Sequence, residues 1–113
     1  MTPDELDAWL LAYVEKEEAT FAWDWEADLA FARATKADPD TVGLIHTAVK
    51  GMGPATYTAY YMPEWLGIKK ARIKALGRLT KTGKLTASWS GIPSSVTGGT
   101  TRNRTWTLSG AGR

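Results

Sequence analysis

Between Lys69 and Lys84 the chain carries seven lysine and arginine side chains and no acidic residue. Like charges one helical turn apart repel each other and destabilise an isolated helix. The phosphates of a polynucleotide can offset this repulsion, and each neutralised phosphate releases condensed counterions. The alternatives are a solvated cationic face, or acidic residues of the same chain that fold back onto the cations. We favour nucleic acid.

On a helical wheel, most of these cations lie on the face opposite Leu76. Two others, Lys69 and Arg72, lie near the apolar side, so their stems must extend past it to bring the charges to solvent. The cationic residues that we predict to contact DNA from this segment are Lys69, Lys70, Arg72, Lys74, Arg78 and Lys81.

A second basic group, Arg102, Asn103 and Arg104, follows a stretch rich in threonine and glycine. Small residues allow close backbone approach, and arginine there reaches phosphate or a narrow minor groove. We therefore add these three residues to the predicted DNA contacts, against the alternative of a solubilising loop.

The sequence contains few residues in arrangements that could catalyse a reaction. His46 is the only histidine and has no acidic residue three or four positions away, and the chain has no cysteine. No nucleophile–base pair and no phosphate-cradling glycine motif is evident. We expect no enzyme activity, no catalytic residue, no bound metal and no cofactor.

The charge is divided unevenly along the 113 residues. Residues 1–40 hold eleven acids and three bases, a net charge of −8, whereas residues 41–113 hold eleven bases and one acid, Glu64, a net charge of +10. This asymmetry indicates an anionic partner for the C-terminal part. No apolar run is long enough to span a membrane and no signal sequence is evident, so we expect a cytoplasmic protein with no membrane contact.

Periodicity predicts the elements that carry these groups. Thr2 caps a first helix with Pro3 in its first turn, and that helix continues to about Glu17. Further helices are predicted at residues 23–35, from residue 41 to about Met52, at 56–66 with an interruption at Pro63, and, after a turn at Gly67, at 68–82.

Gly83 ends the basic helix, and the period then changes to two. Residues 85–90 and 104–108 read as two strands of a hairpin with a long tip between them. Trp89 and Trp106 share one register, so we expect them to form a cross-strand pair in the core. The predicted class is mostly α with a C-terminal β-hairpin, an α+β fold.

The order helix, short helix, turn, basic helix, glycine and hairpin resembles the winged helix-turn-helix superfamily of mostly DNA-binding domains. The resemblance covers about residues 41–109, and its carriers are Leu66-Gly67-Ile68, the Ala75-Leu76 run with Leu79, Gly83-Lys84-Leu85 and the basic hairpin. It implies a recognition helix at about residues 69–81 in the major groove and a wing at residues 91–104.

Three segments follow from this reading: an acidic helical extension at residues 1–40, a winged-helix domain at 41–109, and a flexible tail at 110–113. The extension, two extra N-terminal helices, could form a homodimer or contact another protein. The predicted function is a small protein that binds double-stranded DNA, either a transcriptional regulator or an accessory factor of a phage or mobile element. The alternative is a winged-helix adaptor or inhibitor that bridges or blocks protein partners.

Overall fold

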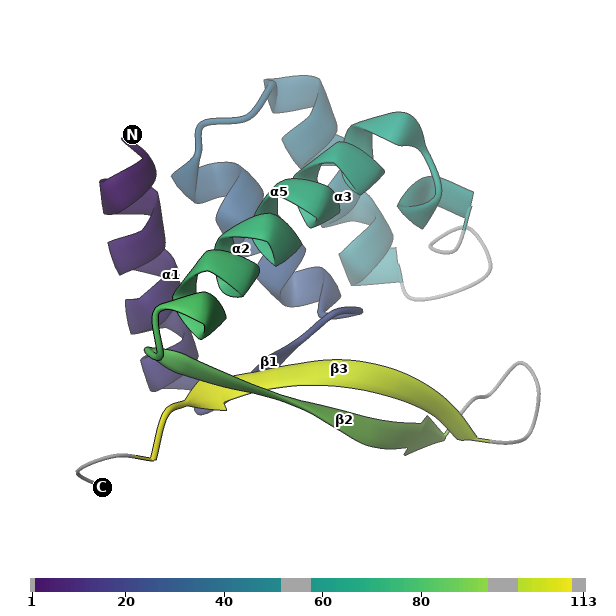
Figure 1. The fold of residues 1–113 in the computed structure, drawn as a ribbon. Coiled ribbons are helices and arrows are strands. Elements are labelled where there is room, and N and C mark those ends of the chain that lie inside the picture. The colour runs from purple at the N-terminus through teal and green to yellow at the C-terminus, as the bar shows by residue number, and fades with distance from the viewer. Residues whose placement is uncertain (1, 52–57, 94–99, 111–113) are drawn as a thin grey trace.

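The computed structural model describes residues 2–51, 58–93 and 100–110 of the protein (Figure 1). Helices lie on one side of a three-stranded antiparallel sheet of order β1-β3-β2, and the class is α+β as predicted (Figure 1). The predicted hairpin tip and tail fall largely outside the described residues. In chain order the elements are α1 (Pro3–Glu17), β1 (Thr20–Phe21), α2 (Trp25–Ala34), α3 (Pro39–Gly51), α5 (Pro63–Lys81), β2 (Leu85–Pro93) and β3 (Thr100–Leu108).

The start of α1 follows the prediction. The Thr2 hydroxyl accepts a hydrogen bond from the backbone N–H of Glu5, and the Glu5 carboxylate accepts one from the backbone N–H of Thr2. This capping box satisfies two donors that a helix start leaves unpaired. At α3 the Asp38 carboxylate accepts from the N–H groups of Asp40 and Thr41.

The basic helix begins earlier than predicted. α5 runs without interruption from Pro63 to Lys81, so the expected turn at Gly67 is wrong. Pro63 occupies the first turn, where its missing N–H has no partner to lose. A glycine inside a helix costs only about 1 kcal/mol relative to alanine, and burial of Trp65 on the preceding turn offsets that cost.

The end of α5 is the predicted one. Gly83 adopts a φ of 82°, in the left-handed region that glycine enters without steric cost. The N–H of Lys84 donates to the carbonyl of Leu79 at 2.9 Å, which closes the helix and directs the chain into β2.

The first forty residues share a core with the rest of the chain. Leu10, Val14 and Phe31 belong to the same buried cluster as Leu76 and Trp106. Burying each such side chain contributes roughly 1.5–3 kcal/mol. The predicted boundary at residue 40 therefore does not separate two cores, and α1 and α2 are integral to this one. A second cluster joins α2, α3 and α5 and contains Ala32, Ile45, Ala59, Tyr60 and Trp65.

The sheet contains one strand that the sequence pattern did not predict. β1 has two residues, and Thr20 pairs with Trp106 on β3. The hairpin β2–β3 is confirmed, but Trp89 and Trp106 are not partners: Trp106 is opposite Ala87, and Trp89 is opposite Arg104. Trp106 is buried and Trp89 is 61% exposed.

Candidate nucleic-acid interface

One side of α5 is open to solvent along most of its length. From Gly67 to Lys81 the exposed residues of α5 fall within about 120° of arc at 100° per residue. They are cationic or small, and none is bulky and apolar; the one exposed acid of the helix, Glu64, lies in its first turn. We call this surface the basic face; its members are Lys70, Lys74, Arg78 and Lys81 together with Gly67, Ala71 and Gly77.

The glycines of the basic face leave unfilled space. A Cβ atom added at Gly67 or at Gly77 would meet nothing within 4 Å. Packing within the chain therefore does not require either glycine. The sequence analysis identified the lysines of this face and missed the small residues. Their helical spacing places them on the same arc as the lysines, so they could have been recognised.

Three lysines of the basic face, Lys70, Lys74 and Lys81, have no ion-pair partner among the described residues. Arg78 differs, because its Nη2 donates to Asp7 Oδ1 at 2.7 Å and its Nε donates to Asp7 Oδ2 at 3.2 Å. These bonds raise the pKa of Arg78. Asp7 of the N-terminal part thus pairs with one cation of the basic face, and the charges of the three lysines have no carboxylate partner among the described residues.

The sequence predicted that Arg72 contacts DNA, and this prediction is wrong because the side chain is buried. Its side chain is fully buried and turned away from the basic face. Nε donates to Asp28 Oδ1 at 2.7 Å, and Nη1 donates to the Thr20 hydroxyl at 3.2 Å. Nη2 donates to the carbonyls of Phe21 and Ala22. The N–H groups of the guanidinium thus donate to acceptors inside the protein, and the side chain does not extend to solvent as the helical wheel predicted.

The second partner of Asp28 completes this buried network. Trp65 Nε1 donates to Asp28 Oδ2 at 3.0 Å, so each carboxylate oxygen accepts at least one hydrogen bond. Burial raises the pKa of Asp28, and the charge and hydrogen bond of Arg72 oppose that rise. The network connects β1, α2 and α5 and sets the position of the basic helix.

Lys69 lies at the edge of the basic face and is partly buried. Its Nζ lies over the Tyr60 ring, 5.1 Å from the centroid, in cation–π geometry. Burial lowers the pKa of Lys69. The stem lies near the apolar side as predicted, but the ammonium lies over Tyr60 instead of extending into solvent, so its charge is less available to a partner than those of its neighbours.

The predicted wing residues lie on β3. Arg104 is exposed, and its guanidinium carbon lies 5.4 Å from the centroid of the Trp106 ring. In the backbone register Arg102 lies opposite Gly91, and Asn103 lies opposite Ser90. The side chains of Arg102 and Asn103 are outside the part of the chain that the structure describes, so their predicted role stays a prediction.

Large apolar side chains are also exposed near β1. Phe21 is 36% exposed and Trp23 is 42% exposed, and both border a hollow of about 240 Å³ that Val49 also lines. The sequence pattern assigned no role to either residue.

His46 is exposed, and its Nδ1 lies 2.9 Å from Arg33 Nη2. Residues 2–51, 58–93 and 100–110 contain no group of three histidine or acidic side chains that could hold a metal ion. Within the same ranges, no helix has the length and apolar character needed to cross a membrane. No protein-family model, no curated protein and no solved structure matches this chain.

Proposed function

We propose that the protein binds double-stranded DNA through the basic face of α5, in the manner of a winged helix-turn-helix domain, with the hairpin β2–β3 as the wing. The observation that carries the proposal is that Lys70, Lys74 and Lys81 share an exposed helix face and have no ion-pair partner among the described residues. Repulsion among them is relieved when phosphates replace their counterions.

The shape of α5 supports the same proposal. Its 19 residues make a rod of about 28 Å, and a major groove about 12 Å wide admits a helix. Because Gly67, Ala71 and Gly77 add little bulk between the cations, the helix backbone can approach a duplex closely. α5 also leads directly into the hairpin, and the N–H of Lys84 donates to the carbonyl of Leu79 where the two elements join.

The proposal includes two biological roles: a transcriptional regulator, or an accessory factor of a phage or mobile element. It also includes a homodimer that forms through the N-terminal helices. The apolar stripe of α1 is buried in the chain's own core at Leu10 and Val14, so a dimer contact would use its exposed side. That side carries Ala8 and Ala12 among acidic residues.

The test is duplex binding by fluorescence anisotropy across a salt series. We expect the affinity to fall steeply with salt, and the Lys70→Ala, Lys74→Ala double variant to have a log–log slope shallower by about 1.8, at roughly 0.9 per lost phosphate contact. The matched control is Lys16→Ala, Lys50→Ala, which removes two exposed lysines from α1 and α3. Salt-independent binding, or equal loss in both double variants, would contradict the proposal.

A protein adaptor is the second candidate, and the exposed Phe21 and Trp23 favour it. Exposed aromatic side chains are typical anchors of protein interfaces. An adaptor would lose its protein partner in a Trp23→Ala variant, and its pull-down would survive nuclease treatment. The DNA-binding protein would keep its duplex affinity in that variant.

A further inference from the structure

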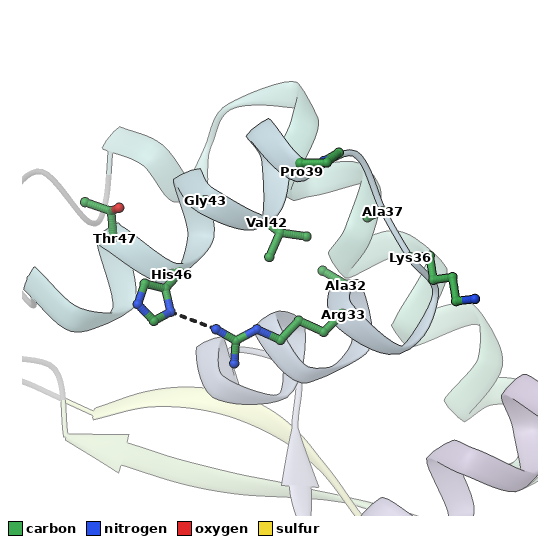
Figure 2. A pocket seen from close by; sticks show the side chains of 9 residues that line it. All are labelled: Ala32, Arg33, Lys36, Ala37, Pro39, Val42, Gly43, His46 and Thr47. Carbon is green, nitrogen blue, oxygen red and sulfur yellow. Dashed lines mark hydrogen bonds between the residues drawn. The ribbon is translucent and has the colours of Figure 1, made fainter.

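A cleft lies between α2 and α3, and no residue of α5 or the sheet contributes to it. Its volume is about 500 Å³, within the range of small-ligand sites. Ala32, Ala37 and Val42 supply apolar lining, and Gly43 adds no side chain to fill the space (Figure 2). The polar residues of the lining are Arg33, Lys36, His46 and Thr47.

The charge of the cleft lining is opposite to the net charge of residues 1–40. Residues 1–40 hold eleven acids and three bases, yet two of those bases, Arg33 and Lys36, line the cleft and no acid does. Asp38, the acid nearest in sequence, directs its carboxylate to the N–H groups that begin α3. The lining therefore carries a net positive charge that no carboxylate in it offsets.

Arg33 has a nitrogen atom and not a carboxylate as its partner: its Nη2 lies 2.9 Å from His46 Nδ1 (Figure 2). A guanidinium can only donate, so a hydrogen bond here uses Nδ1 as the acceptor. Arg72 and Arg78 are paired with carboxylates, which cancel their charge. The imidazole contacts Arg33 without the negative charge that a carboxylate would bring, and the other four N–H donors of the guanidinium have no partner among the described residues.

Lys36 stands at the rim, with its ammonium directed away from the cleft in Figure 2. Its backbone has a φ of 55° at the position after the end of α2 where glycine is usual. A lysine there carries a steric cost that glycine avoids. Its flexible, exposed stem can turn the ammonium toward an anion held by Arg33.

We propose that this cleft binds a small organic anion, with a carboxylate or phosphate group on Arg33 and Lys36 and an apolar body against Ala37 and Val42. A DNA backbone would leave the apolar lining uncovered, so the chemistry fits a compact ligand better than a polynucleotide. The site shares no residue with the basic face of α5, and its test is independent of duplex binding.

The test is titration of the isotope-labelled protein with phenyl phosphate and with benzoate at constant ionic strength, followed by amide NMR shifts. One anion or both should give saturable shifts centred on residues 36–47, with a dissociation constant on the order of millimolar for a ligand of this size. Benzyl alcohol, which keeps the ring and lacks the charge, should bind at least about tenfold more weakly.

Three variants separate binding from folding. Arg33→Gln should weaken binding at least about tenfold, whereas Lys16→Gln, which removes the third base of the acidic part, should not. Lys36→Gly removes the ammonium and relieves the backbone, so it should lower affinity while raising the unfolding midpoint. Gly43→Leu fills space in which a Cβ meets nothing within 4 Å, so it should block binding without unfolding α3.

Wild-type affinity in Arg33→Gln or in folded Gly43→Leu would overturn the proposal. Equal affinity for benzyl alcohol, or the absence of saturable shifts with either anion, would overturn it as well.

Discussion

Arg72 Nε donates to Asp28 Oδ1 at 2.7 Å with both side chains fully buried, and this pair joins α5 to α2. Further bonds from the same guanidinium reach Thr20 and the carbonyl of Phe21 at β1. The orientation of the basic face therefore depends on an arginine that is not part of it.

Breaking the Arg72–Asp28 pair from either side should destabilise the protein strongly. Arg72→Met or Asp28→Leu leaves one buried charge without its partner, and such a change typically costs about 3–5 kcal/mol. The double variant removes both charges and should be less destabilising than the two single changes added together. Urea unfolding of the three variants measures this coupling, and simple additivity would show that the two groups act independently.

Asp7→Asn should strengthen duplex binding. The substitution releases Arg78 from its only ion pair among the described residues and removes a negative charge beside the basic face. The salt slope should become steeper by up to about 0.9. The unfolding free energy should change by less than about 1 kcal/mol, because the pair is exposed. Glu15→Gln, an exposed charge change elsewhere on α1, is the control, and the same gain in affinity there would remove Asp7 from the explanation.

The same substitution should have opposite effects at two glycines. Gly77→Ala places a methyl group in open space on a helix and should stabilise the protein by about 0.5–1 kcal/mol. Gly83→Ala forces alanine into a φ of 82° and should destabilise it by about 1–2 kcal/mol. Thermal unfolding of both variants gives the two signs. Destabilisation by Gly77→Ala would mean that the site is more crowded than the structure shows.

The capping box of α1 should make part of the stability depend on pH. The N–H of Thr2 and then its hydroxyl hold the pKa of Glu5 below its ordinary value of 4.5. Because the folded pKa is the lower one, this contribution is complete above the unfolded value and is lost as pH falls through the folded pKa. The midpoint difference between the wild type and Glu5→Gln should therefore shrink in acid. A difference that stays constant from neutral to acidic pH would argue against a charged cap.

Local signals were sufficient wherever a short stretch decides its own conformation. Thr2 and Pro3 marked the start of α1, and Gly83 marked the end of α5. A period of two identified the hairpin. These features depend on backbone donors, on allowed φ values and on alternation, all of which are encoded within a few residues.

The sequence-based predictions were wrong where contacts with a segment distant in sequence determine the local structure. Gly67 continues a helix because α5 packs along its length against α1, α2 and α3. Trp89 lies on the same alternation as Trp106, yet Trp89 is exposed and Trp106 is buried, because alternation along a strand does not encode which part of that strand the rest of the chain covers. The short strand β1 exists because β3 lies beside it, and two residues carry no periodic signal of their own.

By itself the sequence determined the α+β class, most helix ends, the hairpin and the uneven charge of the two parts of the chain, since composition and short-range periodicity encode them. Only the tertiary structure decided which cations face solvent. Lys70 and Lys74 are exposed and Arg72 is buried, although all three lie within five residues of one helix. The reason is that the Arg72 guanidinium donates to Asp28, to Thr20 and to two backbone carbonyls. These acceptors are remote in sequence, so a helical wheel of α5 alone cannot show them.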